Sequence, residues 1–204
     1  MRSQKVFAAS IAHEIRTPVA VVKLELEQID HPRARRAERD LAALTHTLEQ
    51  LTALARIDAA EGQSFRATDL CRLARETAEE LAPLVFASGR SIAFWSSGTV
   101  EARIVPELVV VLIRNLVENA VKHTKPNTCI TVVVQEPGVL SISDNGEGFP
   151  AHEQLDTEMG AVKRSGALGL GLKIVDRIAA LHGARLAIAS SPDGGASVRL
   201  EFAS

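Results

Sequence analysis

Apolar residues in the first 60 positions follow the repeat of two helices packed in a bundle. Over residues 3–29, and again in a second helix that begins near Arg33, they are spaced alternately by four and three positions. The seam positions are Ile15, Val19, Val22, Leu26 and Ile29, then Leu41, Leu44, Leu48, Leu51 and Ala55. Pro18 should bend the first helix, and Asp30-His31-Pro32 ends it, so the helices should run antiparallel. Because one hairpin cannot bury both seams, the pattern predicts a homodimer that forms a four-helix bundle.

The helical pattern lapses at residues 60–64, where small and polar residues dominate. We therefore place a domain boundary there and divide the chain into residues 1–61 and 62–204. The elements expected after the boundary are a short strand near Phe65, helices over 69–86, 106–123 and 170–181, and strands over 91–96, 128–135, 139–144, 185–190 and 197–202. Strands that pair mostly as hairpins, with helices between them, predict an α+β sandwich in which one mixed sheet carries helices on one face.

Composition excludes several classes of protein. The formal net charge is −2, and basic residues do not gather with aromatic ones, so no nucleic-acid surface is expected. The longest apolar run, residues 108–113, is too short to cross a bilayer, and no signal-peptide core follows Met1. We expect no membrane contact. Cys71 and Cys129 lack metal-ligand spacing, which favours reduced thiols in the cytoplasm.

His13 is the first candidate for chemistry. It precedes Ile15 by two positions, about 200° around the helix, so it should point away from the apolar seam. Glu14 follows it directly, and the hydroxyl of Thr17 lies four residues on. A single exposed histidine is usually an ordinary surface residue, so the rest of the chain decides whether this one is functional.

A stripe of polar residues marks the helix expected over 106–123. Asn115, Asn119, Lys122 and His123 recur at helical spacing among Val and Leu residues. Carboxamides are costly to bury unless something binds them, and Mg²⁺ with phosphate oxygens would suit such groups. The alternative is a pair of ordinary surface asparagines.

Two glycine-containing segments could complete a nucleotide site. Asp144 ends a strand and is followed by Gly146 and Gly148, so its carboxylate could accept a hydrogen bond from an exocyclic amine such as that of adenine. Taken alone, this segment could be a polar turn.

The second glycine segment opens the last expected helix. Gly166, Gly169 and Gly171 would expose the N–H groups and the positive end of the helix dipole, which favours phosphate. Neither common phosphate loop fits, because Leu172 stands where a Walker loop has lysine and Ile174 stands where a dinucleotide fingerprint has glycine.

Taken together, these motifs resemble those of the catalytic core of a two-component sensor histidine kinase. Residues 10–18 resemble its phosphoacceptor box, residues 115–123 its asparagine box, and residues 144–148 and 166–171 its two glycine boxes. The resemblance covers nearly the whole chain. It implies a dimeric helical hairpin domain over residues 1–61, followed by an ATP-binding sandwich of the GHKL or Bergerat type, as in gyrase and the Hsp90 chaperones.

The resemblance also implies roles for individual residues. His13 would accept the phosphoryl group, Glu14 would polarise its imidazole, and Thr17 would orient water for removing phosphate from the partner. Asn119 would bind Mg²⁺. The residues implied to bind ATP are Asn115, Asn119, Lys122, His123, Asp144, Gly146, Gly148, Gly166, Gly169 and Gly171.

The implied function is an ATP-dependent protein-histidine kinase that passes its phosphate to an aspartate of a response regulator receiver domain and has phosphatase activity toward it. The chain would be cytoplasmic, either as a natural soluble kinase or as the cytoplasmic part of an inner-membrane sensor. One alternative is a phosphotransfer or scaffold protein with a degenerate nucleotide site. A gyrase-type ATPase clamp fits less well, because Asn115 stands where that class has a glutamate base. Residues 154–165 also depart from the family in lacking a phenylalanine.

Overall fold

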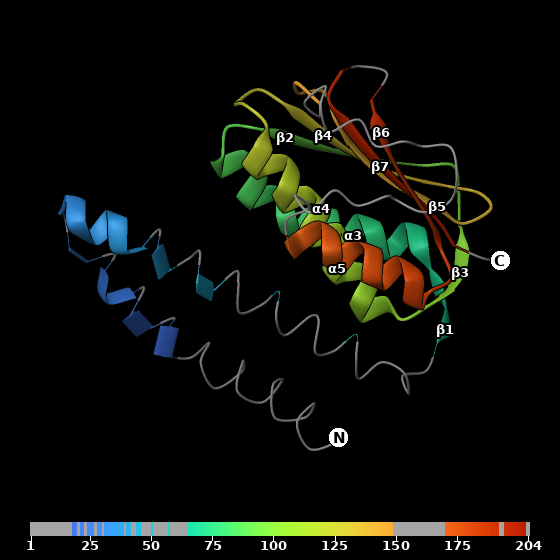
Figure 1. Ribbon diagram of the computed structural model, residues 1–204, viewed down its shortest axis with the longest axis horizontal. Helices are drawn as coiled ribbons and strands as arrows, with labels where there is room; N and C mark the ends of the chain where they lie inside the picture. Colours follow the sequence, from blue (N-terminus) through green and yellow to red (C-terminus); the bar gives the residue numbers. More distant parts are fainter. Residues whose placement is uncertain are drawn as a thin grey trace. The chain divides into compact units, whose positions relative to one another are not determined.

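The computed structural model describes residues 65–148, 170–191 and 194–202, together with short stretches between residues 18 and 57. The chain divides into two compact units, Met1–Gln63 and Ser64–Ser204, and each is described by itself (Figure 1). In the first unit, most of the described residues are helical, and residues 32–38 form a continuous helical stretch. The amide of Arg33 donates to Nδ1 of His31 at 3.1 Å, which supports the expected break near Pro32.

The described part of the second unit contains three long helices, and all three lie where the sequence predicts them. Helix α3 spans Leu70–Ala87, α4 spans Pro106–His123 and α5 spans Leu170–Leu181. Asp69 caps the start of α3, because its carboxylate accepts a hydrogen bond from the amide of Arg72 at 3.0 Å. Pro106 occupies the first turn of α4, where its missing N–H costs nothing.

The main sheet has five strands in the order β2-β4-β5-β7-β6. Their bounds are Ser91–Ser96 for β2, Cys129–Gln135 for β4, Val139–Asp144 for β5, Arg185–Ser190 for β6 and Ala196–Glu201 for β7. Strand β2 pairs in parallel with β4, and the other three pairs are antiparallel. Helices α3, α4 and α5 cover one face of this sheet (Figure 1). The expected α+β sandwich is therefore confirmed.

The expectation of one mixed sheet is wrong in one respect. Strand β1, Arg66–Asp69, pairs antiparallel with β3, Glu101–Ile104, and these two form a separate sheet. The sequence analysis missed β3 because its four residues include two charged side chains. Only Ala102 and Ile104 point inward, a pattern too short to stand out from a loop.

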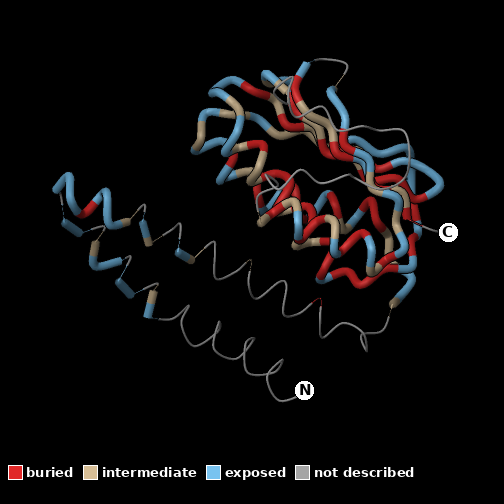
Figure 2. Tube along the Cα trace, viewed as in Figure 1, coloured by how far each residue is buried: buried red, intermediate tan, exposed pale blue. Residues whose placement is uncertain are grey.

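The core lies between the main sheet and the helices (Figure 2). Strand β4 buries alternate residues, as a strand with one covered face should. The largest fully buried side chains include Leu81, Leu108, Leu112, Ile130, Leu140, Ile174, Ile178 and Leu200. Across the described ranges, none of the helices has the length and apolar character needed to cross a membrane. The packing holds α4 between α3 and α5, and α4 carries the polar stripe noted in the sequence.

Candidate functional site

Two asparagines of α4 face the first turn of α5. A Cβ atom added to Gly171 would lie 3.2 Å from Oδ1 of Asn115 and 3.3 Å from Oδ1 of Asn119. Contacts this short are tighter than ordinary van der Waals packing, so a side chain at position 171 would push the amides away. The absence of a side chain at Gly171 thus lets the start of α5 approach the polar stripe of α4.

Asn115 is 6% exposed, so it is not an ordinary surface asparagine. Its Nδ2 donates to the carbonyl oxygen of Val111 at 2.8 Å. This bond offsets part of the cost of burying the amide, so burial alone does not require a ligand. Asn119, one turn later, is partly exposed, and both Lys122 and His123 are exposed. The stripe therefore runs from a buried amide to two solvent-accessible basic side chains at the end of α4.

Asp144 lies at the end of β5 and is almost buried, with 8% of its surface exposed. Its Oδ1 accepts hydrogen bonds from the amides of Gly146 at 2.9 Å and Ala196 at 3.3 Å. In the described part of the chain, these two bonds both go to Oδ1. A carboxylate held by backbone amides at one oxygen is a rigid acceptor at the other.

The backbone of Gly195 packs closely against Asp144, a role that the sequence analysis missed. It has a φ of +82°, and a Cβ atom there would lie 2.2 Å from the carbonyl oxygen of Asp144 and 2.4 Å from its Oδ1. Gly148 adds to this arrangement, because its Cβ would lie 2.9 Å from the carbonyl oxygen of Gly195. The signal in the sequence is the doubled glycine at 194–195, between the strands expected over 185–190 and 197–202.

The Asp144 segment also reaches the end of α4. A Cβ on Gly146 would lie 2.9 Å from Cγ2 of Thr124, the residue after the last helical residue of α4. Arg90 holds Thr124 from the other side, since its Nε donates to Oγ1 of Thr124 at 3.0 Å. The two parts of the site thus border the same stretch of α4, which from Asn115 to Thr124 is about 13 Å long at 1.5 Å per residue.

An ion pair lies beside this end of the site. Lys125 donates to Glu147, and this hydrogen bond, with the opposite charge, raises the pKa of Lys125 above its ordinary value. Both side chains are largely exposed, so solvent screens the pair and it adds little to stability. The pair does link Glu147, which follows Gly146, to the loop after α4.

The donor set bears on which cofactors the site could hold. Among the residues that the structure describes, no three acidic, histidine or cysteine side chains gather into a metal centre. The oxygens of Asn115 and Asn119 are nevertheless hard ligands, suited to Mg²⁺ that also binds phosphate. The residues therefore fit a metal that arrives with a nucleotide better than a resident metal ion.

Five residues expected to be functional lie outside the described residues. They are His13, Glu14, Thr17, Gly166 and Gly169. The segment 154–165, which departs from the expected pattern, lies there too. Of the expected site residues that the structure describes, Asn115, Asn119 and Gly171 come together, and Asp144 comes together with Gly146 and Gly148.

Comparisons with known proteins identify relatives of this chain. Residues 104–204 match the family of histidine kinase-, DNA gyrase B- and HSP90-like ATPases. The chain is 28% identical over 197 residues to the sensor protein BasS of Escherichia coli, covering 88% of this chain and 53% of BasS. It is also 28% identical over 217 residues to the sensor-type histidine kinase PrrB of Mycobacterium tuberculosis, covering 99% of this chain and 48% of PrrB. It thus spans about half the length of these relatives.

A solved structure extends the comparison to the fold. The ATP-binding domain of PrrB from Mycobacterium tuberculosis superposes with a TM-score of 0.53 at 27% identity, over 68% of this chain and 96% of that domain. The share of this chain that the match covers is close to the length of the second unit. Residues 104–204 therefore belong to the histidine kinase-, DNA gyrase B- and HSP90-like ATPase family, within a chain that is homologous to sensor histidine kinases.

Proposed function

We propose that this chain is a histidine kinase core that phosphorylates its own His13 from Mg-ATP and passes the phosphoryl group to an aspartate of a response regulator receiver domain. The observation that carries the proposal is the meeting of two sets of groups along the end of α4. There, Asn115 and Asn119 face Gly171, and Asp144 is enclosed by glycines. The names of the relatives as sensor histidine kinases support the same activity.

ATP would bind along this part of α4. Oδ2 of Asp144 would accept a hydrogen bond from the exocyclic amine of adenine, while Oδ1 stays bound to backbone amides. The amides at the start of α5 would meet the phosphates, helped by the positive end of the helix dipole. Asn119 would hold Mg²⁺, which neutralises phosphate charge, and Lys122 would add a positive charge nearby.

His13 would be the nucleophile. Glu14 would accept the Nδ1 proton of the neutral imidazole, so that the other ring nitrogen attacks the γ-phosphoryl group in line. A nitrogen–phosphorus bond forms as the bond from the γ-phosphorus to ADP breaks. Since His13 and the nucleotide residues belong to different units, transfer requires the two units to approach, and the segment near Gly62 would act as the hinge. The phosphate would then pass to the carboxylate of the receiver domain.

A homodimer would complete the first unit. Val22, Ile29 and Leu44 belong to the predicted seams, and within a single chain they are 43%, 52% and 67% exposed. Pairing two hairpins into a four-helix bundle would cover such side chains.

Labelling from γ-labelled ATP and Mg²⁺ tests this function. The unsubstituted chain should gain label that survives alkali and is lost in acid, because protonation of a phosphoramidate nitrogen makes it a good leaving group. Acid-stable label would place the phosphate on a hydroxyl and contradict the proposal. A chain that binds ATP without gaining label, or that does not bind millimolar ATP, would favour the scaffold alternative.

Replacing Thr17 with alanine should separate the two reactions proposed for the phosphoacceptor helix. In the helix that the sequence predicts, the hydroxyl would lie one turn beyond His13, where it could orient water toward the aspartyl phosphate of the partner. We expect Thr17→Ala to gain label at the normal rate but to dephosphorylate a labelled receiver domain about tenfold more slowly, the scale of one lost positioning interaction. The measurement is loss of label from the receiver domain with time. Equal rates for Thr17→Ala and Thr17→Ser, the control that keeps a hydroxyl, would contradict this role.

A further inference from the structure

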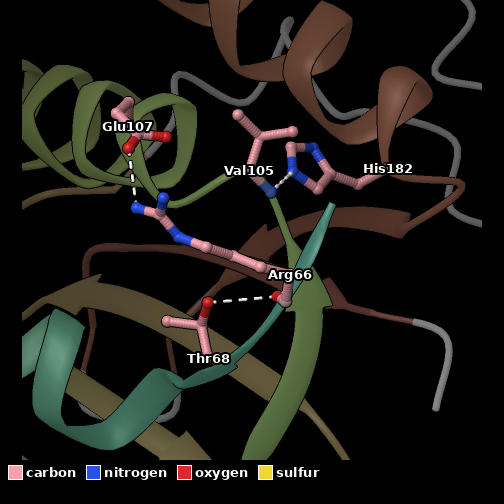
Figure 3. A network of polar contacts seen from close by, with 5 residues as sticks. All are labelled: Arg66, Thr68, Val105, Glu107 and His182. Atoms are coloured by element: carbon pink, nitrogen blue, oxygen red, sulfur yellow. Dashed lines mark hydrogen bonds and ion pairs between the residues drawn. The ribbon is translucent and has the colours of Figure 1, made fainter. Parts of the chain in front are cut away.

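A buried histidine joins the far ends of the two helices that form the candidate site. His182 follows the last residue of α5 and is 8% exposed. Its Nε2 accepts a hydrogen bond from the amide of Val105 at 3.0 Å, and its Nδ1 lies 2.8 Å from the carbonyl oxygen of Ile178 (Figure 3). The rings of Phe65 and Phe202 meet the imidazole edge-on, with centroids 5.2 and 5.7 Å away.

These contacts define the protonation state of the ring. The amide of Val105 can only donate, so Nε2 must carry a lone pair, and Nδ1 must carry the proton that reaches Ile178. A second proton on Nε2 would break the bond to Val105. Burial lowers the pKa of His182 below its ordinary value and outweighs the opposing effect of the Ile178 carbonyl. The ring is therefore neutral in the folded protein near pH 7.

The bond to Val105 matters because of where α4 begins. Val105 is the N-cap residue of α4, and within the described residues no side chain caps this end. The imidazole thus ties the start of α4 to the end of α5. At the opposite end of the pair, Gly171 lies against Asn115 and Asn119. The two connections are about 16 Å apart along α5, by helix rise.

We propose that neutral His182 is a positioning residue that sets the register of α4 against α5, and thereby the contact of Gly171 with Asn115 and Asn119 on which ATP binding depends. The inference rests on the proposed function, because it requires that α4 and α5 hold a nucleotide. When both connections are present, α4 and α5 are fixed relative to one another along their axes. When only one is present, the remaining apolar contacts between the two helices can repack.

Among the residues that the structure describes, no charged group lies in contact with the imidazole of His182. In the described part of the chain, the groups that contact the imidazole of His182 are two backbone groups and two phenylalanine rings. Among the charged residues of the surrounding elements, Arg66 on β1 binds Glu107 on α4 at 2.7 Å (Figure 3). Arg185 on β6 lies opposite Glu201 on β7 in the strand register.

A pH dependence follows from the lowered pKa. The unfolded chain takes up a proton at His182 near the ordinary value of about 6.5, and the folded chain takes it up only at lower pH. The contribution of the neutral ring is therefore complete above about pH 6.5 and declines as pH falls from there toward the lowered pKa. The folded chain itself should lose affinity for ATP only at lower pH, as the pH falls through the lowered pKa of His182.

Two variants of the full chain test the proposal. His182→Gln retains an acceptor for the amide of Val105 but cannot titrate, and His182→Phe fills the space without an acceptor. His31→Gln is the matched control, because the imidazole of His31 also accepts a backbone amide but is exposed. Affinity for a fluorescent ATP analogue with Mg²⁺ is measured from pH 8 down to the lowest pH at which circular dichroism shows the chain to be folded.

We expect the unsubstituted chain and His31→Gln to lose affinity together as the pH falls through the lowered pKa of His182, whereas His182→Gln keeps its affinity to lower pH. His182→Phe should bind about tenfold more weakly at every pH, because the amide of Val105 is left without its partner. Titration of the nucleotide affects all variants alike and cancels in the comparison.

Several outcomes would overturn the proposal. One is the same pH profile for His182→Gln and the unsubstituted chain, and another is full affinity in a folded His182→Phe. If His182→Phe does not fold, the profile of His182→Gln decides. If the unsubstituted chain binds no ATP, both the proposed function and this inference are overturned. If it binds ATP and the affinity does not depend on the residue at position 182, this inference alone is overturned.

Discussion

Replacing His13 with alanine should reduce labelling of the chain from γ-labelled ATP to background while leaving affinity for Mg-ATP unchanged. The methyl group of alanine has no lone pair to attack phosphorus, so the nitrogen–phosphorus bond cannot form. The groups proposed to bind ATP lie in the other compact unit, between Asn115 and Gly195, and do not include His13. The measurements are label retained on the chain after electrophoresis and nucleotide affinity by fluorescence.

His31→Ala is the control for this experiment. His31 belongs to the same unit and is exposed, but its ring nitrogen accepts the amide of Arg33 at the start of the next helix. We expect this variant to gain label normally. Label that persists on His13→Ala would refute the assignment of the phosphoacceptor, and loss of ATP affinity in that variant would show that His13 contributes to the nucleotide site itself.

Gly195→Ala should disrupt the adenine end of the site and lower ATP affinity at least about tenfold, since backbone has to move to relieve the clash. The added Cβ would lie 2.2 Å from the carbonyl oxygen of Asp144 and 2.4 Å from its Oδ1, far inside contact distance. The φ of +82° adds strain for any residue other than glycine, about 1–2 kcal/mol. With an overpacking cost of about 1–3 kcal/mol, we expect the free energy of unfolding to fall measurably in urea.

The variant Gly194→Ala separates the effect of backbone strain from the effect of a steric clash. Gly194 has a φ of +83° in the same turn, but its Cβ would lie 3.5 Å from the carbonyl oxygen of Gly146, an ordinary contact. This variant should lose only the strain energy, about 1–2 kcal/mol, and should keep its affinity for ATP. Equal affinities for the two variants would show that the enclosure of Asp144 by Gly195 does not matter for binding.

Local sequence patterns were sufficient for most elements of the second unit. Three local signals lie at helix ends in the structure: the capping carboxylate of Asp69, the proline at position 106 and the glycine at position 183. These signals work because capping and backbone conformation depend on residues within one helical turn. Strand β3 was missed for the converse reason, since its stability comes from pairing with β1, more than 30 residues earlier in the chain.

The candidate site also has features that the local sequence predicts and features that depend on contacts between distant segments. The spacing of Asn115, Asn119 and Lys122 placed them on one side of a helix, and Asp144 was marked by the strand before it and the glycines after it. The order of these motifs also carried the resemblance to histidine kinases. Each of these features is local, so the sequence alone determined which residue types were available and on which elements they lay.

Only the tertiary structure decided which of these groups meet, because contacts between distant segments depend on packing that no local pattern encodes. It brought Gly171 against the amides of α4 and Gly195 against Asp144. It also buried His182 between two phenylalanine rings, where its neutral form joins α4 to α5. A glycine that fills a turn and a glycine that admits a neighbouring backbone look alike in sequence, and they differ only in what surrounds the missing Cβ.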